Sequence, residues 1–219
     1  MQKIAFLFAL CYNKYGGNMI PKRIIFCWFG GKEKPENVVN CIKTWKEQMP
    51  DYEYLEINES NFDINYNEYV KNAYENKKWA FVSDVARLWA LYNYGGVYMD
   101  TDVLVYQPLD KFLKHRFFTG FENIHYPVTA TIGAEKENKL IKQMLDWYEG
   151  KVFTMHENWW EYETNTVIMS NILGKYFDRD KVEYQENSNC AIYPRKTFCY
   201  SEEIDEDVYT RHLMFGSWG

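Results

Sequence analysis

Two carboxylates, Asp100 and Asp102, stand one residue apart after a short apolar run. In an extended chain, side chains at positions i and i+2 point the same way, so both carboxylates can share one hard divalent cation with a diphosphate. A metal in that position neutralises a phosphate leaving group. The flanking sequences GGVYM and VLV are apolar, which places the triplet at the end of a buried core strand. Burying unpaired carboxylates there is costly, which favours a functional interpretation.

Three further groups are candidates for binding. Asp84 and Arg87 are three residues apart in a predicted helix, where composition alone favours a surface ion pair contributing a few tenths of a kcal/mol. Trp28 ends a predicted strand, where ligands of open α/β sheets bind, and it can stack on a nucleobase; a core tryptophan is the alternative. The terminal residues 216–219, GSWG, are either a frayed tail or part of a site.

Composition limits the classes of partner. The chain has 219 residues and a net charge of −6, with no basic stripe, so we expect one domain that does not bind nucleic acid. An acidic protein that handles an anionic nucleotide needs a metal or local Arg and Lys side chains. Aromatic residues make up 19% of the chain, which indicates either rings lining a sugar- or base-stacking groove or an AT-biased genome.

The cysteines and the first residues bear on location. Five cysteines are scattered without a CxxC pair, which is typical of reduced thiols in a cytoplasmic protein. The apolar run at 4–11 is too short to span a bilayer and makes a weak signal peptide. We therefore expect residues 1–18 to be a dispensable leader, Met19 the working start and 19–219 the domain. Peripheral contact with the inner face of a membrane is the alternative for this run.

The first half of the chain predicts strands alternating with helices. An apolar strand at 23–29 precedes a helix at 35–49 with apolar residues at helical spacing, and a strand follows at 52–57. This order favours an α/β fold with parallel pairing. Residues 58–78 are predicted as a short helix between loops.

The central and later segments complete one domain with a mixed central sheet. A helix at 79–94 is stopped by Gly95-Gly96, because glycine tolerates a left-handed cap. A brief strand at 97–99 then leads into the Asp-Thr-Asp triplet. The remaining predictions are strands at 103–105, 117–122, 129–134, 191–193 and 212–215, a helix at 137–148, and a helix or strand at 164–173.

The run from Phe81 to Asp102, with SDVAR and YGGVYMDTD, resembles the DxD glycosyltransferases of family 32. That family includes capsular polysaccharide and lipopolysaccharide sugar transferases and yeast initiating mannosyltransferases, and is related to the clostridial glucosylating toxins. The resemblance covers most of residues 20–218, because it extends to IPKRII and WFGG within 20–31, IGAEK at 132–136 and FGSW at 215–218.

This resemblance implies a GT-A-like, Rossmann-like nucleotide-sugar-binding fold, Mn²⁺ or Mg²⁺, and retention at the anomeric carbon. The implied partners are a UDP- or GDP-sugar donor and a glycan or lipid-linked sugar acceptor in surface polysaccharide biosynthesis. On the donor side, Trp28 would stack on the base, and Asp84 and Arg87 would hold the sugar. Tyr98 and Asp100 would lie against the ribose and diphosphate.

The resemblance also implies the metal ligands and a closing segment. Asp102 would be the direct ligand, joined by Asp100 and Ser217, and the two aspartates would be the catalytic residues. Ser217 and Trp218 would close over the diphosphate. The chain departs from the family where paired histidines are usual, since only His212 matches, and where Thr-Asn-Thr at 164–166 replaces a Thr-Gly-Pro-like segment. Acceptor-side residues are therefore not assigned.

Two other functions stay open. In a haloacid-dehalogenase-like phosphatase, Asp100 would be the nucleophile and the acidic residues 202–207 would supply metal ligands. Against it, the triplet does not follow the first strand. A non-catalytic carbohydrate-binding domain would use Trp159-Trp160 as a platform, which would not explain a strand-end DxD. No sequence feature favours a secreted host-modifying toxin.

Overall fold

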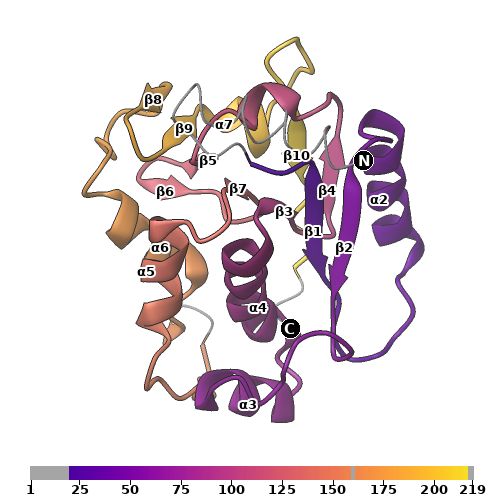
Figure 1. The fold of residues 1–219 in the computed structure, drawn as a ribbon, viewed down its shortest axis with the longest axis vertical. Coiled ribbons are helices and arrows are strands. Elements are labelled where there is room, and N and C mark those ends of the chain that lie inside the picture. Colours follow the sequence, from indigo (N-terminus) through magenta and orange to yellow (C-terminus); the bar gives the residue numbers. More distant parts are fainter. Residues whose placement is uncertain (1–19, 159–160, 217–219) are drawn as a thin grey trace, which may run out of the picture.

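A mixed sheet forms the centre of the computed structural model, which describes residues 20–158 and 161–216 (Figure 1). The strands lie in the order β2 (Glu53–Ile57), β1 (Arg23–Cys27), β3 (Gly96–Met99), β7 (Thr131–Ala134), β5 (Phe117–Asn123), β9 (Ala191–Tyr193) and β8 (Gln185–Glu186), with β6 (Tyr126–Pro127) paired to β5.

Strand direction decides where a site can form. β1 pairs in parallel with β2 and β3, and β5 pairs in parallel with β9. β7 runs antiparallel to both β3 and β5, so β1, β2, β3, β5 and β9 share one direction. Their carboxyl ends therefore meet at one edge of the sheet, where open α/β folds bind ligands. The predicted α/β domain with a mixed sheet is confirmed.

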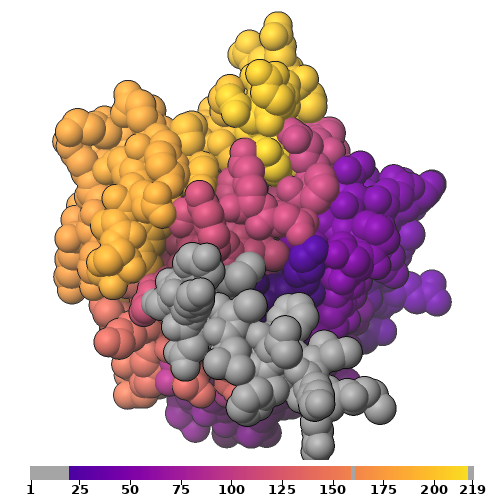
Figure 2. Space-filling view, turned by 45° about the horizontal axis from the view of Figure 1, so that its top comes forward, coloured from indigo at the N-terminus to yellow at the C-terminus, as the bar shows by residue number. Residues whose placement is uncertain are grey.

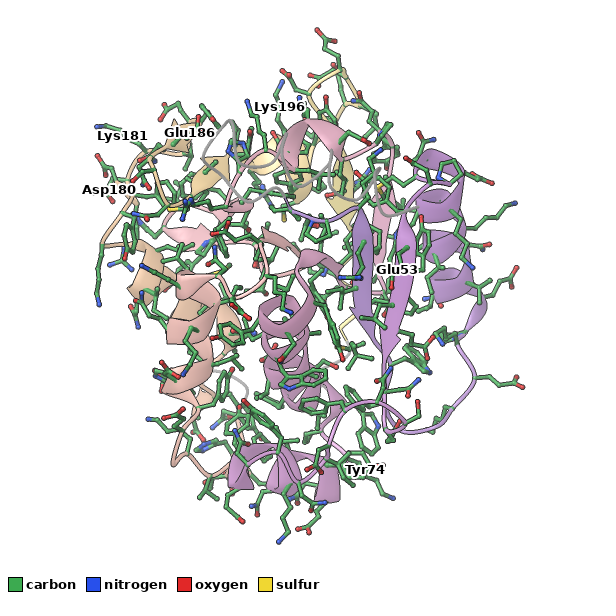
Figure 3. The ribbon with its side chains drawn as sticks, in the orientation of Figure 1. Glu53, Tyr74, Asp180, Lys181, Glu186 and Lys196 are labelled. Atoms are coloured by element: carbon green, nitrogen blue, oxygen red, sulfur yellow. The ribbon has the colours of Figure 1, made fainter. Side chains whose placement is uncertain are left out.

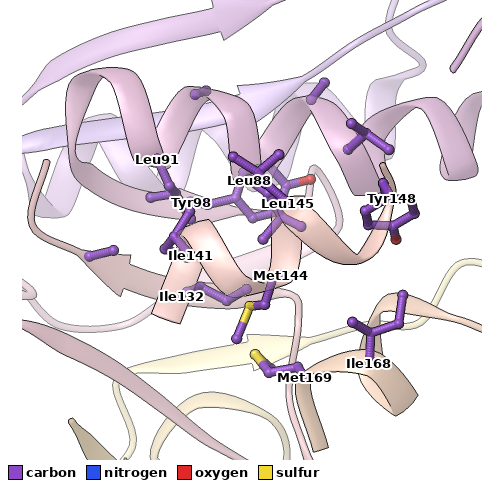
Figure 4. Packing of buried hydrophobic residues seen from close by; sticks show 14 of the residues in the cluster. Leu88, Leu91, Tyr98, Ile132, Ile141, Met144, Leu145, Tyr148, Ile168 and Met169 are labelled. Carbon is purple, nitrogen blue, oxygen red and sulfur yellow. The ribbon is translucent and has the colours of Figure 1, made fainter. Parts of the chain in front are cut away.

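Helices cover both faces of the sheet. On one face, α4 (Trp79–Tyr94) packs with α3 (Glu68–Glu75), α5 (Lys139–Trp147) and α6 (Asn165–Leu173). Figure 4 shows Leu88 and Leu91 of α4 beside Ile141 and Leu145 of α5. On the other face, α2 (Glu36–Gln48), the 3₁₀ turn η1 (Asp110–Phe112) and α7 (Arg195–Phe198) enclose a second core around Trp45, Phe112 and Phe198.

Two consecutive glycines turn α4 directly into β3. Gly95 ends the helix at φ +65°, and Gly96 starts the strand at φ +134°. A Cβ on Gly96 would meet the carbonyl oxygen of Arg23 at 2.7 Å, so only glycine fits beside β1. This turn sets α4 against β3, and it brings side chains of the helix next to the end of that strand.

β4 (Val103–Val105) and β10 (Thr210–His212) form a separate two-stranded antiparallel sheet. His212 is level with Val103, immediately after the Asp-Thr-Asp triplet. The predicted strand at 212–215 was therefore wrong in its bounds, since the strand ends where 213–215 turns toward Asp102. The undecided segment 164–173 is the helix α6.

The described helices include none that is both long and apolar enough to cross a membrane. Ile20 is buried, and its amide donates to the carbonyl of Leu113, so the domain is packed from the first described residue. Residues 1–18 lie outside the described residues, and their dispensability stays a prediction.

Candidate active site

Asp100, Asp102 and His212 form a compact group of ligand atoms beside β3. One carboxylate oxygen from each aspartate and one imidazole nitrogen lie within 4.8 Å of one another. His212 Nε2 is 3.3 Å from Asp102 Oδ1. The triplet and His212 are far apart in sequence. They come together because β10, which ends at His212, pairs with β4, the strand that follows the triplet.

The chain after β10 is tied to the triplet. The amide of Leu213 donates to the carbonyl of Asp102 at 2.9 Å. The amide of Phe215 donates to Asp102 Oδ2 at 3.0 Å. The segment leading to Ser217 and Trp218 therefore passes directly over Asp102.

Arg87 links the helix α4 to the triplet. Its Nη2 atom lies 3.2 Å from Asp84 Oδ1 and 3.2 Å from Asp100 Oδ1. Its guanidinium carbon lies 4.5 Å from the centre of the Tyr98 ring, and the Tyr98 hydroxyl donates to Asp100 Oδ1 at 2.6 Å. The side chains of Asp84 and Arg87 are only 2% and 5% exposed, so the surface ion pair favoured by composition is wrong: this is a buried network.

Unpartnered polar atoms are concentrated here. Of five buried side-chain nitrogen or oxygen atoms without a hydrogen-bond partner in the described structure, three are Asp84 Oδ2, Asn165 Oδ1 and His212 Nδ1. Asn165 is held by its own Nδ2, which donates to the carbonyl of Asp84 at 3.0 Å. Because buried polar groups are normally paired, these atoms indicate a place that a polar ligand completes.

The environment shifts the protonation of these groups. Burial raises the pKa of Asp84 to about 6, although Arg87 opposes the shift. Burial disfavours charge on both Asp102 and His212, but their mutual interaction prevails. The pKa of Asp102 is therefore lowered, and that of His212 is raised to about 10. Burial also raises the pKa of Glu122, the next residue but one after Gly120 of β5, with His212 and Arg195 opposing the shift.

Trp28 lies at the same edge of the sheet. Ile25 of β1 is level with Tyr98 of β3, so the chain just beyond them brings Trp28 level with the triplet. The ring is half-buried, donates from Nε1 to the Lys32 carbonyl at 2.6 Å, and has the Lys34 ammonium 5.5 Å from its centre. Its position at the strand end is compatible with the predicted stacking on a base.

Some predicted residues fall outside the described part of the chain: Ser217, Trp218 and the Trp159-Trp160 pair. Their roles stay predictions. The structure adds Asn165, Glu122 and His212 to the site. His212 had been noted only as the match to one of the family's paired histidines, and Asn165 only as part of a departure from the family pattern. Glu122 had no distinguishing signal beyond its place at the end of a predicted strand.

The group Asp100–Asp102–His212 fits a divalent metal. Carboxylate oxygens suit Mn²⁺ and Mg²⁺, and an imidazole nitrogen is an ordinary transition-metal ligand. His212 is half-buried, and its buried Nδ1 atom, which has no hydrogen-bond partner in the described structure, is an observation in favour of such a ligand set. These residues would hold the ion where the resemblance places it.

A separate cavity of about 390 Å³ is lined in part by residues of α7 and by none of the site residues described above. It is lined by Lys111, Lys114, Tyr184, Tyr193, Pro194, Lys196, Thr197 and Asp207. Lys196, labelled near the top of Figure 3, is already paired with Asp205 and Asp207. The residues coloured yellow, late in the chain, project from the body of the molecule in the space-filling view (Figure 2).

Residues 35–119 match a protein family described as "Glycosyltransferase sugar-binding region containing DXD motif". The matched region runs from the residue before α2 into β5 and includes both the Asp84–Arg87 pair and the Asp-Thr-Asp triplet. No curated protein sequence matches the chain.

Two solved structures share the fold. One, described as "PaToxG Glycosyltransferase", superimposes with a TM-score of 0.58 at 19% identity, covering 78% of this chain and 76% of that one. The other is "a glycosyltransferase involved in the glycosylation of the major capsid of PBCV-1", with a TM-score of 0.54 at 13% identity and coverage of 90% and 96%. At these identities the likeness concerns the fold, which is GT-A-like.

Proposed function

We propose that this chain, a glycosyltransferase by its DXD sugar-binding region and its fold, transfers a hexose from a UDP- or GDP-sugar to a glycan or lipid-linked sugar acceptor. The observation that carries the proposal is the contact of Asp100 with both halves of the site. Arg87 joins it to buried Asp84, and the metal-ligand group joins it to Asp102 and His212.

The residues on the α4 side suit the donor sugar. Asp84 Oδ2 and Asn165 Oδ1 are buried acceptors without partners, and sugar hydroxyls are donors that would satisfy them. Arg87 contacts the Asp84 carboxylate and donates from Nη1 to the Thr129 carbonyl at 3.1 Å, which holds the Asp84 side chain in place. Trp28 at the strand end is assigned to the nucleobase.

The residues on the β10 side suit the diphosphate. Mn²⁺ or Mg²⁺ held by Asp100, Asp102 and His212 would neutralise charge on the leaving diphosphate. In the transfer, the bond from the anomeric carbon to the diphosphate oxygen breaks, and the nucleoside diphosphate leaves with the electron pair. A bond forms to the acceptor oxygen, and the acceptor's hydroxyl proton passes to the leaving phosphate oxygen on the same face. No side chain is needed as nucleophile, which agrees with retention of configuration.

The biological setting follows the family resemblance: surface polysaccharide biosynthesis, in the cytoplasm or at the inner face of the membrane. The acceptor in such a setting is a growing glycan or a lipid-linked sugar. We assign no linkage.

The test is release of UDP or GDP from a panel of nucleotide sugars by the full chain with Mn²⁺. We expect slow hydrolysis that EDTA abolishes and added Mn²⁺ restores. p-Nitrophenyl phosphate is the companion substrate, because its turnover would support the phosphatase alternative with Asp100 as nucleophile. Undiminished nucleotide release in EDTA would remove the metal from the proposal.

A further inference from the structure

Tyr200 is flanked by two arginines on the outer side of the site. The guanidinium carbon of Arg195 lies 4.9 Å from the centre of the Tyr200 ring, and that of Arg211 lies 5.0 Å from it. Tyr200 and Arg195 are exposed, and Arg211 is half-exposed. An exposed cation–π contact contributes only about 0.5–1 kcal/mol, so stability alone is a weak reason to gather two guanidiniums on one ring.

The topology puts this arginine pair beside the reacting centre. Gly120 of β5 is level with Tyr193 of β9, so Glu122, near the end of β5, and Arg195, two residues after the end of β9, lie toward the same edge of the sheet. β10 reaches the Tyr200 segment through its backbone, because the amide of His212, the residue after Arg211, donates to the carbonyl of Cys199 at 2.8 Å. Glu122 interacts electrostatically with both Arg195 and His212, which agrees with a position of Arg195 on the β10 side of the site.

The two guanidiniums are not used in ion pairs. Within residues 20–158 and 161–216, neither Arg195 nor Arg211 has a carboxylate oxygen within 4 Å, whereas neighbouring Lys196 has two such partners. In a chain with a net charge of −6, two cations left without carboxylates at one edge are available to an outside anion. Guanidinium forks bind phosphate and carboxylate oxygens two at a time.

The donor does not account for this pair. Its sugar is assigned to Asp84, Arg87 and Asn165 and its diphosphate to the metal-ligand group. We propose that Arg195 and Arg211 bind an anionic group of the acceptor, so that the preferred acceptor carries a phosphate or a carboxylate near the hydroxyl that receives the sugar. This inference rests on the proposed glycosyltransferase function and assigns the acceptor's chemical class.

The experiment is calorimetric titration of three small probes into the full chain, loaded with Mn²⁺ and the nucleoside diphosphate that the donor panel identifies. The probes are glucose 6-phosphate, glucuronate and neutral glucose. We expect at least one anionic probe to bind about tenfold or more tighter than glucose, a difference of about 1.4 kcal/mol. Arg195→Gln and Arg211→Gln should each remove that preference. Preference for the phosphate or for the carboxylate identifies the source of the anion.

Arg179→Gln is the matched control, because Arg179 is also exposed and without an ion pair among the described residues but lies outside the site. It should keep the anion preference. Both site variants should keep the melting temperature of the unchanged chain, and Arg179→Gln should also keep its acceptor-free nucleotide release. Equal binding of all three probes, or a preference that survives both site variants, overturns the inference. Absence of acceptor-free nucleotide release in the unchanged chain would instead contradict the proposed function itself.

Discussion

The backbone amide of Phe215 donates a 3.0 Å hydrogen bond to Oδ2 of Asp102, across 113 positions of sequence. With His212 on Oδ1, both oxygens of this carboxylate are engaged by the end of β10 and the chain that follows it. The end of the described chain and the triplet are therefore structurally coupled. We expect a substitution in one of them to alter the geometry of the other.

Asp102→Asn should abolish most nucleotide-sugar turnover without unfolding the chain. An amide is a poor ligand for a hard cation, and it also replaces the carboxylate oxygen that lies 3.3 Å from His212 Nε2. We expect a loss of about a hundredfold or more, equivalent to about 2.7 kcal/mol of transition-state stabilisation. Asp100→Asn should also impair turnover, since it breaks the contact with Arg87. The measurements are turnover with Mn²⁺ and melting temperature.

Asp63→Asn serves as the control, because Asp63 is exposed and distant from the triplet in sequence. Near-unchanged turnover by Asp102→Asn would contradict its assignment as a metal ligand. Loss of activity only in Asp100→Asn, together with cleavage of phosphate monoesters, would favour the phosphatase.

His212→Gln should weaken Mn²⁺ binding while leaving the fold in place. The imidazole is the only nitrogen in the three-residue ligand group found among the described residues. Removing one ligand of three should raise the Mn²⁺ concentration needed for half-maximal turnover about tenfold or more, as mutation of residues around metal sites commonly does. The measurement is turnover against Mn²⁺ concentration, with His156→Gln as an exposed control. The same Mn²⁺ requirement in both variants would exclude His212 as a ligand.

The donor side of the site could be predicted because it is local in sequence. Helix 79–94, the two glycines and the strand into Asp100 are consecutive, so periodicity and glycine positions fix their order and their contact. The parallel pairing of β1 with β2 and β3 also follows from the strand–helix–strand order. What spacing alone could not show is burial. Asp84 and Arg87 would have the same i, i+3 spacing on an exposed helix face as they have in the buried network.

The other half of the site depends on contacts between distant segments. His212 meets Asp102 only because β10 pairs with β4, and three-residue strands carry almost no periodic signal. Arg195 and Glu122 come together through the parallel pairing of β5 with β9, which no local pattern specifies. Thr164–Leu173 was ambiguous because its apolar residues fit a helix or a buried strand, and packing against α5 decided for the helix.

Asp84→Asn should change both the pH dependence of stability and the affinity for the donor, and the two effects can be measured separately. Burial raises the pKa of Asp84 from 3.8 to about 6, so between these values the folded state binds more protons than the unfolded state. Stability therefore falls as pH rises through this window, by a contribution on the order of 3 kcal/mol. The asparagine lacks this titration. We expect the melting temperature of Asp84→Asn minus that of the unchanged chain to increase as the pH is raised from 4 to 6.

Donor affinity of Asp84→Asn should fall at the same time, because one buried acceptor for sugar hydroxyls becomes an amide. The measurements are melting temperature against pH and donor dissociation constant at pH 7.5. Ser83→Ala, at the neighbouring position of α4, is the control. A variant that is less stable at pH 7.5 but binds donor normally would make the Asp84–Arg87 pair structural.

The last four residues should act as a lid over the donor. Gly216 bends the chain at φ +73° one residue after Phe215, whose amide contacts Asp102, and Ser217 and Trp218 are the next residues in the sequence. A hydroxyl can join the metal or a phosphate, and a ring can cover the diphosphate and exclude water, which limits wasteful hydrolysis. A chain stopped after Phe215 should keep its fold and its hydrogen bond to Asp102.

That truncated chain should nevertheless bind donor more weakly and transfer sugar about tenfold more slowly or worse, a loss of about 1.4 kcal/mol in transition-state stabilisation. Trp218→Ala should reproduce much of the loss, whereas Met214→Ala, at an exposed side chain of the same segment, should not. The measurements are transfer rate, donor dissociation constant and melting temperature without donor. Unchanged transfer rates would show that residues 216–219 have no role in donor binding or transfer. A collapse of the melting temperature would make Trp218 a core residue, because a lid contributes to stability only when donor is bound to the native state.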